Sequence, residues 1–251
     1  MRSGPEREGA GMELKDRVAM ISGASRGLGA ALARRFAEEG AAVSICARDE
    51  AELLAGAEEL SARGGRVLAV PCDVTDEAAV RDWVGRTRER FGRLDALVNN
   101  ASLLGRRVGV EAYPLDEWRA VLDVNLTGAF LCAKHAIPAL RETRGSLIHV
   151  SSGVGDHGRP FWGAYCASKN GLEALSEMLA GELAEQGIRS NAVDPGAMRT
   201  GMRAAAYPDE SPDTLPAPYE ITDVFVWLAS EASREVSGER FRAREFRRPE
   251  G

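Results

Sequence analysis

Short apolar runs alternate with longer amphipathic segments along most of the chain. The apolar runs are six or seven residues long and predict buried β-strands; they lie at 17–22, 42–47, 66–72, 94–99, 146–151 and 188–194. The segments between them place apolar residues three and four positions apart, as on one face of a helix, at 27–39, 50–63, 76–91, 115–141 and 163–186. This alternation predicts an α/β fold, in which a doubly wound parallel sheet is covered by helices on both faces.

Two regions depart from this rhythm. Residues 1–12 carry Gly, Pro and both charges but no apolar run, so we expect a disordered N-terminal extension followed by a single domain over 13–251. After Asp194 the chain becomes rich in Pro and turn residues before a last apolar helix in ITDVFVWLAS. Because long irregular segments in a domain are more often functional than not, we interpret residues 197–219 as a substrate loop.

The composition excludes several classes of function. A net charge of −6 argues against a nucleic-acid or anionic-membrane partner, since either requires a basic surface. No stretch approaches the roughly 18 apolar residues of a membrane span. The four cysteines form no C-x-x-C pair, which predicts reduced thiols in a cytoplasmic protein. The three histidines lack metal-ligand spacing, so we expect no metal site.

A glycine-rich turn, SGASRGLG at 22–29, follows the first predicted strand and opens the first predicted helix. Gly23, Gly27 and Gly29 allow a tight turn and the close approach of a pyrophosphate, and a helix N-terminus offers unpaired N–H groups. The alternative is a purely structural turn, because isolated glycine patterns are weak signals. The position between strand and helix favours a dinucleotide site.

The residues after the second strand bear on which dinucleotide is bound. NAD sites place a carboxylate there for the ribose hydroxyls, whereas NADP sites need cations for the 2′-phosphate. Here Arg48 follows the strand, no acid precedes Asp49, and Arg26 lies inside the glycine turn. Two guanidiniums that can each form forked bonds to a phosphate favour NADP(H) over NAD(H).

Tyr165 and Lys169 are four residues apart in a predicted helix, which places them on one face. A phenol ionises near pH 10, so a tyrosine that acts as acid and base at neutral pH needs its pKa lowered by roughly three units, or about 4 kcal/mol. A neighbouring ammonium can contribute to this, although a helical surface pair is the common alternative for Tyr-x-x-x-Lys. Ser152 or Ser151, at the end of the fifth strand, could hold a substrate oxygen beside the tyrosine.

These motifs resemble, in type and order, those of the short-chain dehydrogenase/reductase (SDR) family, over about residues 15 to 240. The glycine turn is similar to the family's T-G-x-x-x-G-x-G signature with Ser22 in place of Thr, and YCASK at 165–169 is similar to its Tyr-x-x-x-Lys motif. NNAS at 99–102 resembles the family's N-N-A-G with Ser in place of Gly. The resemblance implies a Rossmann fold with about seven strands, and the substrate loop resembles that of a bacterial subgroup of oxidoreductases whose substrates are poorly defined.

The resemblance also implies residue roles. Tyr165 is the general acid/base for hydride transfer between a nicotinamide and a carbonyl or alcohol, and Lys169 lowers its pKa and binds the nicotinamide ribose. Ser152, which the family's spacing selects over Ser151, orients the substrate, and Asn125 anchors a water that joins the lysine to solvent. The implied cofactor contacts are Gly23, Ser25, Arg26, Gly27, Leu28, Gly29, Arg48, Asp73, Val74, Asn100, Ala101, Tyr165, Lys169, Pro195, Gly196 and Thr200.

The substrate stays open at this stage. Relatives end in an apolar strand and a D-G-G turn, but this chain ends GERFRAREFRRPEG. Candidate substrates are 3-oxoacyl thioesters, quinones, keto sugars and steroid-like ketones, and Trp162, Met198, Met202 and Tyr207 flank the site in sequence. A catalytically silent NADP-binding regulator or scaffold is the alternative function, and epimerisation or dehydration a third. The family implies a homodimer or homotetramer.

Overall fold

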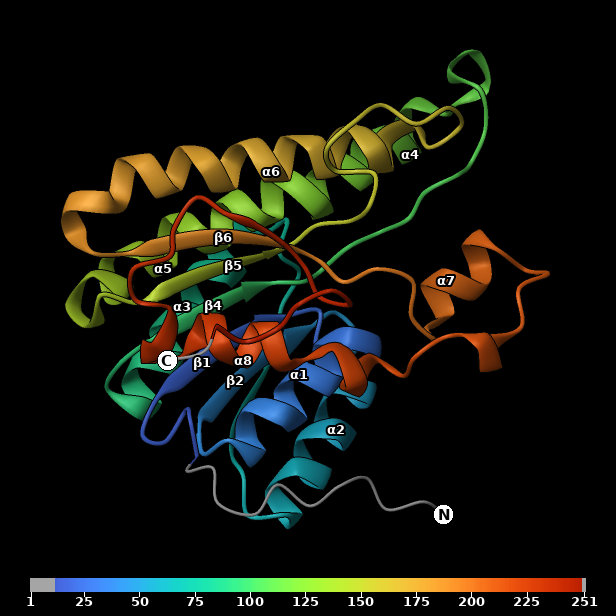
Figure 1. Cartoon of the computed structure of the whole chain (residues 1–251). Helices are drawn as coiled ribbons and strands as arrows, with labels where there is room; N and C mark the ends of the chain where they lie inside the picture. Colours follow the sequence, from blue (N-terminus) through green and yellow to red (C-terminus); the bar gives the residue numbers. More distant parts are fainter. Residues whose placement is uncertain (1–11, 250–251) are drawn as a thin grey trace.

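A single sheet of seven parallel strands forms the centre of the protein, in the order β3-β2-β1-β4-β5-β6-β7. The structure, a computed structural model, describes residues 12–249 (Figure 1). The strands are β1 (Val18–Ser22), β2 (Ala42–Ala47), β3 (Arg66–Pro71), β4 (Ala96–Asn99), β5 (Ser146–Val150), β6 (Arg189–Asp194) and β7 (Arg240–Arg242). The first six lie where the apolar runs predicted them. Apart from Met12, the predicted N-terminal extension lies outside the described residues.

The strand order reverses between β1 and β4. Ile21 of β1 pairs with Ile45 of β2 on one side and with Val98 of β4 on the other. Ligands of doubly wound folds bind at such a reversal, beyond the carboxyl ends of the strands. The glycine turn after β1 and the residues after β4 therefore meet at the edge where a ligand is expected.

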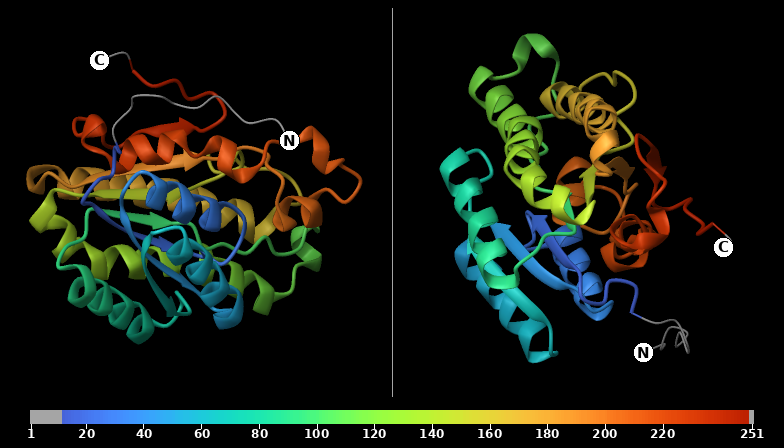
Figure 2. Two further views of the ribbon diagram at one scale, coloured as in Figure 1. Left: turned by 90° about the horizontal axis from the view of Figure 1, so that it is seen from below. Right: turned by 90° about the vertical axis from the view of Figure 1, so that its left-hand side faces the viewer.

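Helices cover both faces of the sheet, as predicted (Figure 2). Those with apolar residues in the core of one face are α1 (Gly27–Glu38), α2 (Glu50–Ala62) and α8 (Asp223–Ala229). Those of the opposite face are α3 (Glu77–Phe91), α5 (Gly128–Thr143) and α6 (Gly163–Leu183). Asp76 caps the N-terminus of α3 by accepting hydrogen bonds from the backbone N–H groups of residues 78 and 79.

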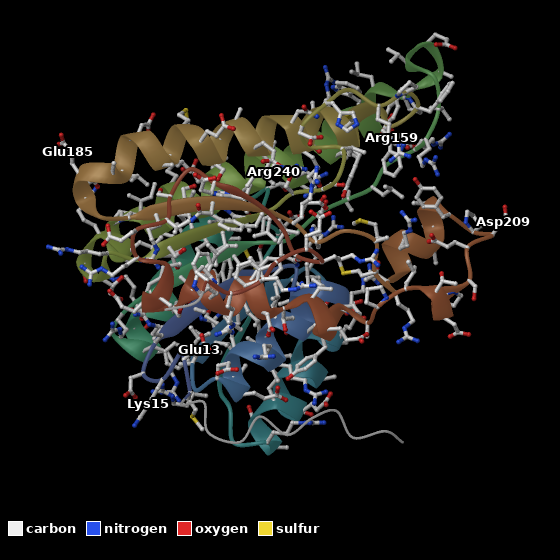
Figure 3. All side chains as sticks on the ribbon, viewed as in Figure 1. Glu13, Lys15, Arg159, Glu185, Asp209 and Arg240 are labelled. Carbon is white, nitrogen blue, oxygen red and sulfur yellow. The ribbon has the colours of Figure 1, made fainter. Side chains whose placement is uncertain are left out.

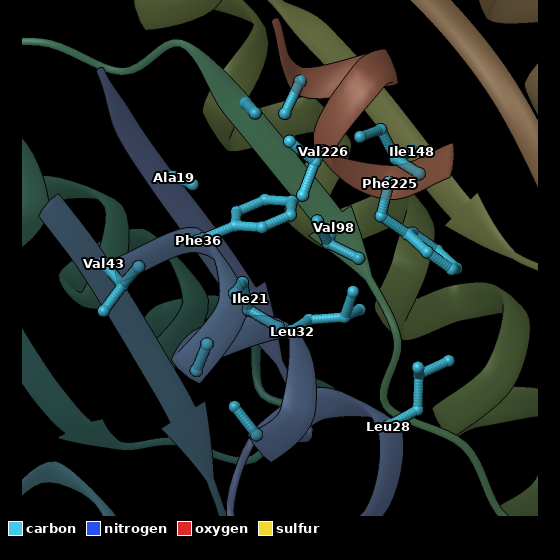
Figure 4. Close-up of a cluster of buried hydrophobic side chains, with 14 of the residues drawn as sticks. Ala19, Ile21, Leu28, Leu32, Phe36, Val43, Val98, Ile148, Phe225 and Val226 are labelled. Carbon is cyan, nitrogen blue, oxygen red and sulfur yellow. The ribbon is translucent and has the colours of Figure 1, made fainter. Parts of the chain in front are cut away.

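Alternate side chains of each central strand belong to different cores. Ala19 and Ile21 of β1 pack with Phe36 of α1 and Phe225 of α8 on one face (Figure 4). Met20 of β1 lies in the core of the other face. Burial of both faces explains why these strands read as continuous apolar runs in the sequence rather than as alternating ones.

The helix predicted over 115–141 is interrupted in the structure. It consists of α4 (Leu115–Leu122), a π-helical turn over Asp123–Thr127, and α5. By length and composition alone the stretch Leu115–Thr143 could cross a membrane, so the expectation that no segment approaches such a span was too strong. Half of its most apolar window is buried inside the protein, as in a core helix.

The seventh strand was not predicted from the local sequence. Residues 240–242 pair with Ala192–Asp194 of β6. The centroid of the Phe241 ring lies 5.7 Å from that of Trp227 and 6.1 Å from that of Phe246. The strand is short and only partly buried, so its formation depends on β6 and on this aromatic contact. Within the predicted substrate loop, a short helix α7 (Gly201–Ala206) stands apart from the sheet (Figure 1).

Candidate active site

A cavity of about 1330 Å³ opens at the carboxyl ends of the strands. Its volume exceeds that of a typical small-ligand pocket. Most of the predicted site residues line it: Gly23, Ser25, Arg26, Gly27, Leu28, Arg48, Asp73, Val74, Asn100, Ala101, Ser152, Tyr165, Lys169, Pro195, Gly196 and Thr200. Gly29 and Asn125 lie outside this lining. Residues that follow the strands β1 to β6 therefore line the same cavity.

The glycine turn is held by close backbone packing. Gly23 has φ +63°, and a Cβ there would lie 2.7 Å from the Cα of Ala101. A Cβ on Gly29 would lie 2.3 Å from the carbonyl oxygen of Gly23 and 2.6 Å from Nδ2 of Asn100. The turn after β1 therefore requires glycine at both positions, one for conformation and one for space.

Ser22 joins the turn to the end of β4. Its hydroxyl oxygen accepts hydrogen bonds from the backbone N–H groups of Asn100, at 3.0 Å, and Ala101, at 3.1 Å. The Asn100 side chain donates in return to the carbonyl oxygens of Ser22 and Gly23, at 2.8 and 3.0 Å. The Ser22 hydroxyl therefore holds the end of β1 to the end of β4, where the strand order reverses. The sequence motif alone did not specify this structural role.

Two acids lie near the predicted phosphate-binding arginines. Asp49 caps α2, its Oδ1 accepting from the N–H of Glu52 at 3.0 Å, and Glu52 accepts from the Ser25 hydroxyl at 2.8 Å. Arg48 is largely exposed and lies 4.0 Å from Asp73. Sequence reasoning missed Glu52 as a cavity residue; its position in the first turn after β2 was the available signal.

Tyr165 and Lys169 lie on neighbouring turns of α6, and both are buried. The Lys169 ammonium nitrogen lies 5.7 Å from the Tyr165 ring centroid and donates to the carbonyl oxygen of Val150 at 2.7 Å. Burial lowers the pKa of Lys169 to about 8, against an opposing effect of Glu173. Burial raises the pKa of Tyr165, and the hydrogen bond with the Ser152 hydroxyl opposes that rise.

The two candidate serines have different partners. The Ser151 hydroxyl donates to the Glu173 carboxylate on α6, whereas the Ser152 hydroxyl faces Tyr165. Ser151 is thereby engaged away from the tyrosine. Ser152, which the family spacing implied, is therefore the serine whose hydroxyl lies beside the tyrosine, and its role remains a prediction.

Asn125 holds other elements in place rather than lining the cavity. It lies in the π-helical turn, where its Nδ2 donates to the Leu103 carbonyl and to the Ser168 hydroxyl, both at 2.9 Å, and its Oδ1 accepts from the Leu103 N–H at 2.7 Å. The side chain connects the loop after β4 to α6. Such π-helical turns often occur at functional sites, and the helix periodicity of residues 115–141 did not predict this one.

Arg240 of β7 supports the site from outside the cavity lining, and sequence reasoning missed it. Its guanidinium donates to Glu173 at 2.8 Å, to Asp156 at 3.0 Å and to the Ser152 carbonyl oxygen at 3.0 Å. It also lies 3.9 Å from Asp194. One side chain therefore ties the loop that carries Ser152 to α6 and β6.

The remaining predicted residues shape the far end of the cavity. Gly196 has φ +71°, and its N–H donates to the Asp194 carboxylate at 2.9 Å. Thr200 caps α7 by accepting from the Arg203 N–H at 3.2 Å. Trp162, Met198, Met202 and Tyr207, suggested as pocket residues, all line the cavity. No group of three or more potential metal ligands occurs within residues 12–249.

Several known proteins are similar to this chain over most of its length. Residues 17–211 match the profile of the short chain dehydrogenase family. The chain is 34% identical over 245 residues to uncharacterized oxidoreductase YciK of Escherichia coli K12, covering 94% of this chain and 95% of that protein. It is 40% identical over 232 residues to trans-4-hydroxycyclohexanecarboxylate dehydrogenase of Sinomonas cyclohexanicum, covering 89% of each. A short chain dehydrogenase from Shigella flexneri 2a strain 301, solved with NADP, has a TM-score of 0.90 at 32% identity, over 94% of this chain and 100% of that one.

Proposed function

Because the chain belongs to the short-chain dehydrogenase/reductase family, we propose that it is an NADP(H)-dependent oxidoreductase that interconverts a carbonyl and an alcohol. The observation that carries the proposal is that Ser152, Tyr165 and Lys169 lie on the wall of the same cavity as the glycine turn. A regulator that only binds a cofactor needs no tyrosine beside a buried lysine. The dehydrogenase of Sinomonas cyclohexanicum supports chemistry on an alcohol.

The cavity fits a dinucleotide at the glycine turn. No side chain of the described residues caps the N-terminus of α1, so its first N–H groups are free to bind a pyrophosphate. Gly23 keeps the wall at this point free of a side chain. The bound cofactor would supply the hydride, and its oxidised ring a positive charge. Thr200 and Pro195, which line the same cavity, would contact its nicotinamide end if they act as the family resemblance implies.

Charge near the end of β2 favours NADP(H) over NAD(H). The Asp49 carboxylate already accepts a hydrogen bond in capping α2, Glu52 accepts one from Ser25, and neither acid ends β2 itself, the position where NAD sites place a carboxylate for the ribose hydroxyls. Arg26 and Arg48 remain available for a 2′-phosphate. The NADP complex of the Shigella flexneri protein supports the same cofactor.

The buried groups suit proton transfer. Burial raises the pKa of Tyr165, opposite to the lowering that acid and base work at neutral pH requires, so we assign that lowering to Lys169 and to the positive ring of the oxidised cofactor. The phenol then donates its proton to a carbonyl oxygen that Ser152 holds by a hydrogen bond. The Lys169 ammonium then stabilises the phenolate that forms. In the reverse direction the same phenolate accepts the proton of the alcohol.

The test is NADPH oxidation, followed by absorbance, with a panel of keto acids, 3-oxoacyl thioesters, quinones, keto sugars and cyclic ketones. Tyr165→Phe should lower kcat by about 10²- to 10⁴-fold while NADPH binding stays nearly unchanged. Tyr219→Phe is the matched control, because that hydroxyl binds Glu38 away from the cavity. Substantial turnover by Tyr165→Phe would refute the proposed mechanism, and NADPH binding without turnover of any compound would favour a regulator.

A further inference from the structure

Two arginine side chains flank the Trp162 ring, which lies beside Tyr165. The guanidinium carbon of Arg107 is 4.7 Å from the Trp162 ring centroid, and that of Arg159 is 5.1 Å from it. The Trp162 centroid is 5.9 Å from that of Tyr165, and Arg107 also lies 4.8 Å from the Tyr207 ring. We call Arg107, Arg159, Trp162 and Tyr207 the arginine–aromatic cluster. Arg159 lies on the same side of the molecule as α7 (Figure 1 and Figure 3).

The positive charges of this cluster have no acidic partner among the residues that the structure describes. Within residues 12–249 neither Arg107 nor Arg159 has a carboxylate within 4.0 Å. Nearby arginines do have one: Arg106 pairs with Glu117 at 2.7 Å, and Arg203 of α7 is paired within the substrate loop. Two guanidiniums beside one ring repel each other, and an anion bound to Arg159 would offset that repulsion.

Apolar side chains and arginines share the cavity wall around the cluster. Arg159, Trp162 and Tyr207 line the cavity, whereas Arg107 lies between the two rings. The apolar side chains at this end are Leu104, Val154, Met198 and Met202. The acids on the whole wall are Asp49, Glu52, Asp73 and Asp194. The first three follow β2 and β3, at the opposite end, and Asp194 binds the Gly196 N–H.

We propose that the substrate carries an anionic group, a carboxylate or a phosphate, which Arg159 binds at the arginine–aromatic cluster while the carbonyl lies at Tyr165. This rests on the proposed oxidoreductase function. A guanidinium forms forked hydrogen bonds with either anion, and the apolar wall suits a hydrocarbon segment between the two ends of the substrate. Arg107 acts through Trp162 and Tyr207, whose rings it holds together, and adds to the local positive potential.

The experiment compares kcat/KM within pairs of substrates that differ in charge. 4-Acetylbenzoate and its methyl ester test a carboxylate; the acetoacetyl thioesters of 4′-phosphopantetheine and of pantetheine, which differ by the phosphate alone, test a phosphate. Wild-type protein should prefer the anionic member of at least one pair by tenfold or more, and the pair concerned identifies the anion. Arg159→Gln should reduce that preference to below threefold. Arg106→Gln, which removes the same charge from an exposed and paired arginine, should retain it.

Three results would overturn the inference. If wild-type protein has equal kcat/KM for the charged and neutral members of both pairs, the inference of an anionic substrate is refuted. The proposed oxidoreductase function is not affected by that result. An equal loss of preference in Arg106→Gln and Arg159→Gln would show a general charge effect rather than a site. If the protein oxidises NADPH with none of these four compounds and none of the carbonyl panel, the proposed oxidoreductase function is refuted. The inference, which rests on that function, is then refuted as well.

Discussion

Replacing Arg240 should weaken both the folded state and the activity. Its guanidinium donates at 2.8 Å to Glu173, whose side chain is only 10% exposed, and at 3.0 Å to the Ser152 carbonyl oxygen. A hydrogen bond to a charged group contributes about 1.5–3 kcal/mol, and more is lost when a buried partner is left unpaired. The contact with Asp156 is more exposed and contributes little. We therefore expect Arg240→Gln to lower the free energy of unfolding by about 2–4 kcal/mol.

Urea unfolding measures this change, because the midpoint shifts while the slope is retained when only stability is altered. Arg242→Gln is the matched control in the same strand: its ion pair with Glu245 is 3.6 Å long and exposed, so its effect should stay within about 0.5 kcal/mol. Replacing both Arg240 and Glu173 by leucine should cost less than Arg240→Leu alone, since no buried carboxylate is then left without its cation.

Activity gives a second measurement of the same contact. If Arg240 positions the loop that carries Ser152, Arg240→Gln should lower kcat/KM for the carbonyl substrate more than it weakens NADPH binding. An unfolding midpoint equal to that of wild-type protein would refute the energetic reasoning. Unchanged kcat/KM in a destabilised variant would refute the positioning role alone.

Three further predictions concern the cavity. Because burial lowers the pKa of Lys169 to about 8, its ammonium is lost as pH rises through that value, and kcat/KM for reduction should fall above about pH 8; a flat profile up to pH 10 would contradict this. Arg48→Gln should raise KM for NADPH by about 10- to 100-fold and change that for NADH little, in keeping with one lost charged hydrogen bond; an equal effect on both cofactors would argue against a 2′-phosphate contact. Gly29→Ala, whose Cβ would lie 2.3 Å from a carbonyl oxygen, should lower the free energy of unfolding by about 1–3 kcal/mol. Gly85→Ala, whose Cβ meets no atom within 4 Å, should instead leave it unchanged or raise it by about 0.5–1 kcal/mol, and similar urea curves for the two variants would exclude the packing argument.

Features encoded in local patterns were predictable from the sequence. The six buried strands carry continuous apolar runs because both faces of the sheet are covered, and the glycine turn is specified by residues adjacent in the chain. Tyr165 and Lys169 are brought together by one helix. Local information sufficed for each of these.

Features that depend on distant residues were not predictable in the same way. β7 forms because β6 offers a free edge and Trp227 a partner for Phe241, neither of which can be seen in the strand's own polar sequence. In the sequence, nothing distinguishes Arg240 from the other arginines near the C-terminus. Its role depends on Glu173, which only the fold brings beside it. The π-helical turn at Asn125 is set by contacts with two other elements rather than by helix periodicity.

The contact between Arg240 and Ser152 spans 88 positions of the chain, which bears on the order in which the protein folds. Closing so long a segment costs chain entropy before its contacts can compensate. The sheet as far as β6 and the helices packed on it can form before residue 240 has been synthesised, whereas the support of the Ser152 loop cannot. A newly made chain would therefore acquire its fold first and its complete active site only afterwards.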